Sequence, residues 1–433
     1  MASYRNAREL VLDLLIRSER SGTYSNIALD KALEGSSLSE PDRRLASALF
    51  YGIIEKRITL DYRISDLSSR PISQIDPATL NALRLGIYQL TFMDKIPPHA
   101  AINETVSLCS KKSSGFVNGI LRAHTRKAPT ELPDKEKEPT RYLSVAYSVC
   151  EPLCKEFVSI YGFDKTESIF TALGTPPKTT LRANTLILST DTLCSSIDGA
   201  QRTAIAPHGV KVSGAVRDLY GFDNGAFFVQ DEASQICVEA LDAHEGMTVM
   251  DICACPGSKS FGAAINMKNS GLVLSFDLHE NKLSLIKSGA ERLGIDIIST
   301  RAQDGKKPLP EYFMSADRVL CDVPCSGFGV LAKKPELRYK DPAISAGLPA
   351  IQLSILENAC QYVKRGGILV YSTCTVFPEE NEENVRRFLE RHDDFELEPF
   401  TVGTLECKTG YITLLPDEYP TDGFFVAKLK RKK

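Results

Sequence analysis

The sequence lacks several patterns that mark familiar classes of protein. No apolar run approaches the roughly 20 residues that span a bilayer, and the first residues lack the hydrophobic segment of a signal peptide. We therefore expect a cytoplasmic protein without membrane contact. The 12 cysteines are dispersed without a Cys-x-x-Cys pair, which argues against a disulfide scaffold and a structural zinc site. We expect no bound metal, and most thiols to be buried and unreactive.

Two nucleotide-binding signatures are missing as well. The pattern G-x-G-x-x-G is absent, and the turn at residues 254–260 lacks the glycine that directly precedes lysine in a phosphate-binding loop. A nucleoside bound through its ribose, without a pyrophosphate, fits this turn better, and S-adenosylmethionine is such a ligand. Asp277 follows Gly257 by 20 residues, about the spacing of a ribose-binding acid in nucleotide-binding folds.

Length and charge indicate several domains and a possible polyanionic partner. A chain of 433 residues exceeds one hydrophobic core, and 43% hydrophobic with 25% charged residues is ordinary for a globular protein. Residues 1–130 contain 18 Lys and Arg against 13 Asp and Glu, a net charge of +5, which leaves −8 for the remainder. The basic front favours nucleic acid, although ordinary surface variation also explains +5. Likewise, the basic loop 111–118 suits phosphate or a solvated turn.

Apolar periodicity divides the chain into a helical front and an α/β rear. Helical spacing extends over residues 5–125, with helix starts predicted at Ser39 and Asp76. Beyond residue 227, strands alternate with helices. We predict an α/β fold with a doubly wound, mostly parallel sheet, preceded by an all-α domain and a small α+β lobe. The predicted parts are a helical domain (1–128), a linker (129–140), the lobe (141–226) and a catalytic domain (227–433).

A carboxylate and two thiols follow predicted strands in this rear part. Asp322 ends one strand and Cys325 follows it, while Cys374 follows the strand predicted at 368–372. A thiolate is a natural nucleophile for addition to an electron-poor ring, and addition to C6 of cytosine prepares C5 for methylation. A carboxylate at N3 would stabilise the developing charge. The alternative is that both thiols are small buried hydrophobes, as we expect for Cys321 and Cys360.

These motifs resemble those of the RNA 5-methylcytosine methyltransferases. The front resembles the NusB-like RNA-binding domain of the Sun/RsmB branch of that family, which implies a Rossmann-like methyltransferase domain behind it. The resemblance covers nearly the whole chain. Its segments are 101–104, 112–119, 141–147, 180–186, 229–234, 251–259, 322–327, 372–375 and 422–425.

The resemblance implies roles for individual residues. Cys374 would be the nucleophile, Cys325 the cysteine that assists release, and Asp322 a catalytic acid that also lines the cofactor site. Lys259 would reach the junction of cofactor and target, Asp277 the ribose and Asp304 the surroundings of the adenine. The remaining cofactor-binding residues would be Cys253, Ala254, Cys255, Pro256, Gly257 and Ser258. Cys255 and Ser258 replace the usual alanine and glycine, and Ser258 disfavours a positive φ, so we expect altered cofactor affinity.

The leading hypothesis is a monomeric, S-adenosylmethionine-dependent methyltransferase that acts at C5 of one flipped cytosine in 16S ribosomal RNA, free or partly assembled. Lys333, Lys334 and Arg338 are candidates for contacts with the RNA backbone, or else solvated surface. A second hypothesis is an RNA-binding assembly or antitermination-like factor whose methyltransferase domain is vestigial. A third keeps the chemistry but acts on tRNA.

Overall fold

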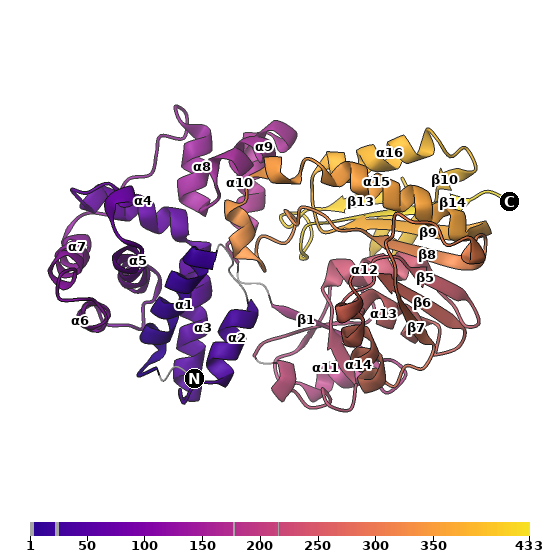
Figure 1. Ribbon diagram of the computed structural model, residues 1–433, viewed down its shortest axis with the longest axis horizontal. Coiled ribbons are helices and arrows are strands. Elements are labelled where there is room, and N and C mark those ends of the chain that lie inside the picture. Colours follow the sequence, from indigo (N-terminus) through magenta and orange to yellow (C-terminus); the bar gives the residue numbers. More distant parts are fainter. Residues whose placement is uncertain (1–3, 22–25, 176–177, 215) are drawn as a thin grey trace. The chain divides into compact units, whose positions relative to one another are not determined.

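The computed structural model describes residues 4–21, 26–175, 178–214 and 216–433, which form two compact units (Figure 1). Unit 1 extends to Phe170 and includes Lys334–Asp341, whereas unit 2 comprises Thr171–Lys333 and Pro342–Lys433. The division between the units falls at neither 128 nor 226, and the four-part domain division stays a prediction. No helix among the described residues is both long enough and apolar enough to cross a bilayer.

Unit 1 is all-helical, as predicted. One core of leucine, isoleucine and alanine side chains joins its first seven helices, with residues such as Leu10, Leu49 and Leu83 fully buried. The helices are α1 (Ala7–Ser21), α2 (Asn26–Glu34), α3 (Glu40–Glu55), α4 (Arg57–Leu67), α5 (Pro77–Phe92), α6 (Pro98–Ser107), α7 (Ser114–Arg126), α8 (Pro139–Tyr147), α9 (Glu151–Tyr161) and α10 (Phe163–Ala172).

The predicted helix starts at Ser39 and Asp76 are confirmed. The side chain of Ser39 accepts a hydrogen bond from the backbone N–H of Asp42 (3.4 Å), and that of Asp76 accepts one from Thr79 (3.0 Å). Each cap satisfies a donor that has no partner within its own helix, and a proline in the first turn costs no hydrogen bond there. The local sequence thus fixes where these helices begin.

Residues 334–341 belong to unit 1 although they lie far along the chain. The Arg338 side chain is only 2% exposed, and its Nη1 donates to the carbonyl of Tyr147 (3.1 Å). The Tyr339 hydroxyl accepts from the backbone N–H of Arg57 (3.1 Å) and shares a hydrogen bond with Ser148 Oγ (3.0 Å). Arg338 is therefore neither a free phosphate contact nor solvated surface, and both predictions for it were wrong.

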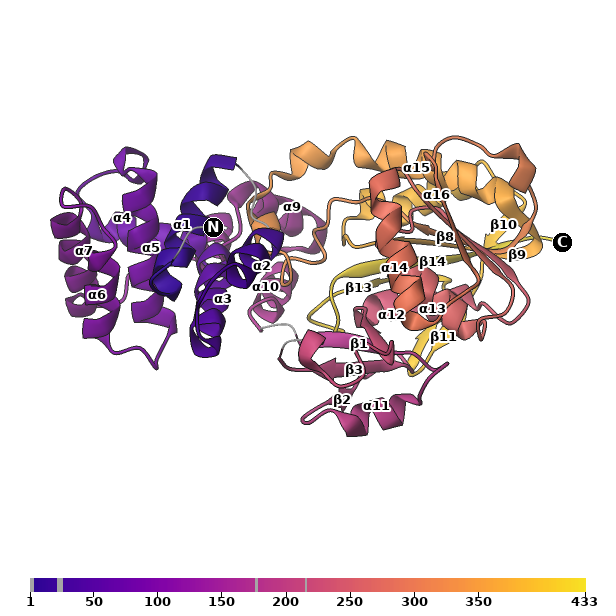
Figure 2. The same ribbon diagram turned by 60° about the horizontal axis from the view of Figure 1, so that its bottom comes forward.

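Unit 2 is built on an eight-stranded sheet whose order is β10-β14-β9-β8-β5-β6-β7, with β13 also paired to β14 (Figures 1 and 2). The five strands from β9 to β7 are parallel, and the C-terminal strands add to them antiparallel. This confirms the predicted fold class. The strands are β5 (Thr248–Asp251), β6 (Leu272–Asp277), β7 (Ile298–Ala302), β8 (Ala316–Asp322), β9 (Val363–Thr373), β10 (Phe395–Leu397), β13 (Tyr411–Leu414) and β14 (Phe424–Arg431).

Helices cover both faces of this sheet, so its strands are buried on two sides. One face packs against α12 (Glu232–Leu241), α13 (Ser258–Asn266) and α14 (Leu283–Leu293). The other packs against α15 (Leu348–Ala359) and α16 (Glu382–Leu389), as Figure 1 shows. Burial on both faces explains why the inner parallel strands are largely apolar rather than alternating, whereas the edge strand β7 is the exception and is mostly exposed.

A smaller antiparallel sheet of order β2-β3-β1-β4 precedes the large one within unit 2. Arg182 on its central strand is fully buried, and its Nη2 donates to Glu239 (2.6 Å) on α12 and Asn266 (2.7 Å) on α13. This buried ion pair joins the small sheet to the helices of the large one. The elements are β1 (Thr179–Ala183), α11 (Thr190–Ser196), β2 (Gln201–Arg202), β3 (Gly209–Val212), β4 (Phe227–Val229) and a separate hairpin of β11 (Phe400–Val402) and β12 (Leu405–Cys407).

Strand β9 is longer than the sequence predicts. The sequence predicts a strand at residues 368–372, whereas β9 begins at Val363. Gly366 has a positive φ of 74°, and the pairing with β8 shifts register between Ala316 and Arg318. Gly366 and Gly367 therefore form an irregularity inside β9. In the sequence, the same glycine pair suggests the boundary of a strand.

Candidate active site

The two cysteines singled out by the sequence lie side by side. They follow β8 and β9, which are adjacent and parallel with Asp322 opposite Ser372. The Sγ atoms of Cys325 and Cys374 are 2.9 Å apart, and the backbone N–H of Cys374 donates to Cys325 Sγ (3.2 Å). The hydrogen bond with Cys374, together with burial, raises the pKa of Cys325 well above its usual range.

A buried carboxylate that the sequence reasoning missed supports the first of these cysteines. Glu380 Oε2 accepts from the backbone N–H of Ser326 (3.0 Å) and from Gln352 Nε2 (2.6 Å), and its side chain is buried. Ser326 Oγ donates to Thr375 Oγ1 (2.8 Å). The residue after Cys325 is thus bonded to the residue after Cys374. These bonds fix the two loops to each other.

Two glycines brace the second cysteine from its backbone side. The N–H of Gly329 donates to the carbonyl of Cys374 (3.0 Å), and the N–H of Gly423 donates to the carbonyl of Gly329 (2.8 Å). A Cβ on Gly329 would lie 2.0 Å from the carbonyl oxygen of Gly423, so only glycine fits. The C-terminal segment before β14 therefore reaches the catalytic loops.

Asp322 is held in place by two neighbours. Lys259 Nζ contacts its Oδ2 at 2.5 Å, and Ser372 Oγ donates to its Oδ1 (2.8 Å). Burial alone would lower the pKa of Lys259, but the Asp322 carboxylate outweighs burial and the net pKa is raised. Lys259 also lies 5.3 Å from the centre of the Phe424 ring. The sequence-predicted pair of Lys259 and Asp322 is therefore a charged pair beside the thiols, with the lysine fixed as a cation.

The turn between β5 and α13 has the form expected for a ligand at a helix N-terminus. Gly257 has a φ of 111°, and a Cβ there would lie 2.6 Å from the Phe261 ring. Ser258 is the first residue of α13 and does not have a positive φ, so the backbone there does not require glycine. The expected change in cofactor affinity stays a prediction. The backbone N–H of Cys255 donates to Asp277 (3.2 Å), which brings the turn against the end of β6.

Four carboxylates lie at or just beyond the carboxyl ends of four neighbouring strands. Asp322 ends β8, Asp251 ends β5 and Asp277 ends β6, while Asp304 follows β7 and accepts from the N–H of Lys306 (3.1 Å). Burial raises the pKa of Asp251 to about 7, and Ser260 Oγ donates to it (2.7 Å). Such an acceptor-rich edge fits a ligand with ribose hydroxyls, amino groups and a positive charge. S-adenosylmethionine has all three.

The structure thus brings some of the predicted site residues together and leaves others apart. It brings together Cys325 with Cys374, Lys259 with Asp322, and Cys255 with Asp277. Cys253 and Cys255 are half-buried on the turn itself, and burial raises the pKa of Cys255 to about 11. Ala254 and Pro256 supply backbone to the same turn. Lys334 is an exposed residue of unit 1. No group of His, Cys, Asp or Glu able to hold a metal occurs among the described residues.

Comparison with known proteins identifies the family. Residues 238–430 match the family described as 16S rRNA methyltransferase RsmB/F, and residues 5–126 match the NusB family. The chain is 38% identical to the probable ribosomal RNA small subunit methyltransferase B of Bacillus subtilis, over 99% of both chains. It is 35% identical to the corresponding protein of Synechocystis, over 98% of this chain and 99% of that one. The chain belongs to the RsmB/F family.

Two solved structures agree with this assignment. The crystal structure of PH0851 is 28% identical, covers 99% of both chains and superposes with a TM-score of 0.78. A methyltransferase homologue from Pyrococcus horikoshii is 27% identical over 66% of this chain and 97% of its own, with a TM-score of 0.58. This member of the RsmB/F family is thus an S-adenosylmethionine-dependent methyltransferase with a NusB-like helical domain in front of a Rossmann-like one.

Proposed function

We propose that this RsmB/F-family enzyme methylates C5 of one cytosine in 16S ribosomal RNA through a covalent bond between Cys374 and C6 of the base. The observation that carries the proposal is the pair of thiols, 2.9 Å apart, beside the charged pair of Asp322 and Lys259. The curated relatives are named as methyltransferases of small-subunit ribosomal RNA. Because neither C5 nor C6 is accessible inside a stacked duplex, the target base must be flipped out.

Each residue has a chemical task in this proposal. The Cys374 thiolate attacks C6, and the electron pair of the C5–C6 double bond moves toward the ring nitrogen N3, where a hydrogen bond from the Asp322 and Lys259 pair stabilises the charge. The bound cofactor supplies the methyl group for C5. Cys325, as its thiolate, then takes the C5 proton. The electron pair of the C5–H bond re-forms the C5–C6 double bond, and the sulfur of Cys374 leaves C6 as a thiolate beside the Cys325 thiol.

The residues expected to hold the cofactor are those of the turn 253–259 with the strand-end acids. Asp277 is assigned to the ribose and Asp304 to the surroundings of the adenine. Asp277 also accepts from the N–H of His279 (3.0 Å), so its carboxylate is already oriented by two backbone groups. A fixed carboxylate loses little freedom when it accepts a hydroxyl of the ribose.

Methyl transfer from labelled cofactor to unmodified 16S ribosomal RNA tests the proposal. Cys374→Ala should abolish transfer, whereas Cys325→Ala should trap a covalent RNA adduct that survives a denaturing gel. Cys360→Ala is the matched control, since this buried thiol lies on the far face of the sheet and its loss should leave transfer intact. Failure of the adduct to form with Cys325→Ala would reverse the assignment of the two thiols.

Calorimetry with the cofactor and the same methyl-transfer assay separate the other two hypotheses. A vestigial methyltransferase domain would show no heat of binding with S-adenosylmethionine in calorimetry. The sequence feature in its favour is the altered cofactor turn, with Cys255 and Ser258, of which Ser258 occupies an ordinary helical position. A tRNA enzyme would label total tRNA in place of 16S ribosomal RNA. We expect binding of the cofactor and labelling of ribosomal RNA alone.

A further inference from the structure

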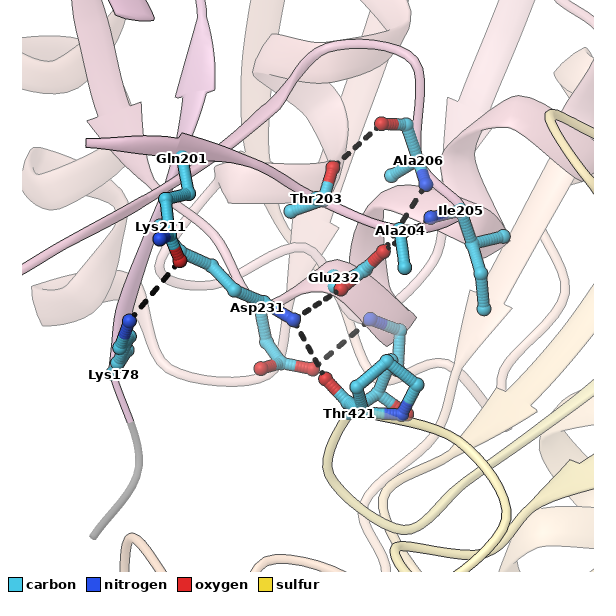
Figure 3. Close-up of polar contacts among 12 residues, drawn as sticks. Lys178, Gln201, Thr203, Ala204, Ile205, Ala206, Lys211, Asp231, Glu232 and Thr421 are labelled. Atoms are coloured by element: carbon cyan, nitrogen blue, oxygen red, sulfur yellow. Dashed lines mark hydrogen bonds and ion pairs between the residues drawn. The ribbon is translucent and has the colours of Figure 1, made fainter.

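A second pocket in unit 2 adjoins the catalytic loops but is used by none of the steps above. It encloses about 460 Å³, within the range of small-molecule sites. Its polar wall comprises Lys178, Thr180, Lys211, Asp231, Lys333 and Asp422. Figure 3 shows part of this wall, with Lys178, Lys211 and Asp231 and the neighbouring Thr421.

A partly buried charge cluster of Lys333, Asp231 and Asp422 forms one wall of the pocket. Lys333 Nζ contacts Asp231 closely and also lies 2.8 Å from Asp422 Oδ2. Burial and the neighbouring Asp231 raise the pKa of Asp422 to about 6. Because one ammonium group serves two carboxylates, this wall carries an excess of hydrogen-bond acceptors. Donors such as the amino and ring N–H groups of a nucleobase suit it.

Residues next to this cluster are hydrogen-bonded to the cofactor turn and to the loops that hold Cys374. Gln230, directly before Asp231, donates through Nε2 to the carbonyl of Ser258 in the cofactor turn (3.0 Å). Gly423, directly after Asp422, is bonded to Gly329, whose N–H donates to the carbonyl of Cys374. Two consecutive hydrogen bonds therefore connect the residue after Asp422 to the backbone of Cys374. This connection places the pocket wall next to the loops that would hold the target base.

The remaining walls supply a ring and a cation. Tyr419 is half-buried and packs on the core of unit 2, and its N–H is fixed by the carbonyl of Leu415 (2.9 Å). Lys178 is exposed and donates only to the side chain of Gln201 (3.2 Å) among its described contacts, as Figure 3 shows. Lys211, in contrast, is held by Glu232 (2.9 Å) and the carbonyl of Pro420 (2.9 Å). Among the three described lysines that line this pocket, Lys178 is therefore the one whose described contacts include no carboxylate and that can face a phosphate.

We propose that this pocket binds the RNA nucleotide adjacent to the target cytosine. The base stacks on Tyr419 and donates hydrogen bonds to Asp231 and Asp422, and Lys178 neutralises its phosphate. This inference rests on the proposed function, since it assumes that RNA carrying a flipped cytosine occupies the active site. It adds a specificity-determining subsite, which favours a neighbour with amino or ring N–H donors on its base.

A double-mutant cycle between protein and RNA tests the subsite. The modified cytosine is first mapped with the unaltered protein. Four RNAs are then made, each with a single abasic nucleotide at one of the two positions before the cytosine or the two positions after it. Tyr419→Ala should lower kcat/KM for intact RNA by about tenfold to a hundredfold, the range that base stacking supplies. One of the four abasic RNAs should lower kcat/KM of the unaltered protein by the same factor as Tyr419→Ala does on intact RNA. On that abasic RNA, Tyr419→Ala should cause no further loss.

Matched variants exclude a merely structural effect. Tyr419→Phe keeps the ring and should retain the full rate, and the affinity of Tyr419→Ala for S-adenosylmethionine should be unchanged by calorimetry. A loss with Tyr419→Ala that persists on all four abasic RNAs would overturn the subsite while leaving the proposed function intact. Absence of transfer to intact RNA by the unaltered protein would refute the proposed function, and the subsite with it.

Discussion

Replacing Gly329 by alanine should disable the catalytic loops without touching a reacting group. A Cβ at this position would lie 2.0 Å from the carbonyl oxygen of Gly423 and 2.9 Å from that of Cys374. Both neighbours are backbone atoms, so neither can rotate away as a side chain would. Contacts of this kind normally exceed 3 Å, which means that the chain must move by about 1 Å at one or both sites.

The magnitude follows from what that movement breaks. The N–H of Gly329 holds the carbonyl of Cys374 and its carbonyl accepts from Gly423, so the shift weakens two hydrogen bonds worth about 1 kcal/mol each. With the overpacking, we expect the free energy of unfolding to fall by about 2–4 kcal/mol. Misplacement of the nucleophile by about 1 Å should lower kcat by about a hundredfold.

Single-turnover methyl transfer and urea unfolding of the full chain measure the two effects. Gly347→Ala is the matched control, because its φ is −84° and nothing lies within 4 Å of the added Cβ. It should change stability by less than about 1 kcal/mol and leave the rate unaltered. If Gly329→Ala retained the rate within about threefold, the close approach of Gly329 and Gly423 would not be what positions Cys374.

Three further substitutions probe buried polar groups. Glu380→Ala removes the acceptor of the Ser326 N–H, so the free energy of unfolding should fall by about 2–4 kcal/mol and the release step should slow. Glu379→Ala, at the exposed neighbouring residue, should have neither effect. Tyr339→Phe should lower the free energy of unfolding in urea by about 1–3 kcal/mol. Its hydroxyl makes contacts with the backbone N–H of Arg57, with Ser148 Oγ and with the carbonyls of Ile54 and Glu55 in unit 1. Burial raises the pKa of Asp251 from 3.8 to about 7, so the folded chain holds this proton more tightly than the unfolded chain. The free energy of unfolding should therefore decrease as pH rises from 4 to 7, by at most about 4 kcal/mol. In thermal unfolding, Asp251→Asn should show a smaller decrease over the same pH range.

The parts of this site that the sequence predicts are those that follow strands. Parallel strands end at a common edge, so a residue just beyond an apolar run is placed without knowledge of the loops. For this reason the strand-end positions of Cys325, Cys374, Asp322 and Asp277 were all predictable, and so was the fold class. The roles assigned to them stay predictions, because geometry shows which groups meet but not which bond forms.

The parts that escaped prediction depend on contacts between distant segments. Glu380 reads as an ordinary acid in a charged run, and nothing local shows that its carboxylate is buried against Ser326, 54 residues earlier. Lys333 was a candidate for contact with the RNA backbone or for solvated surface, but it is held by two carboxylates from separate segments. The segment around Arg338 follows a strand of unit 2 yet belongs to unit 1. Such pairings are set by topology, which periodicity does not report.

The chemistry depends on the register of two strands more than on the conformation of either loop. Asp322 on β8 lies opposite Ser372 on β9, and the bond from Ser372 Oγ to Asp322 Oδ1 (2.8 Å) shows that the register also orients the carboxylate. A slip of one residue would move Cys374 about 3.3 Å along its strand and exchange the faces of β9. The thiols would then separate, and Tyr371, which is fully buried, would leave its core. Burial of the strand faces, a matter of ordinary packing, is therefore what keeps the two sulfur atoms within reach of one base.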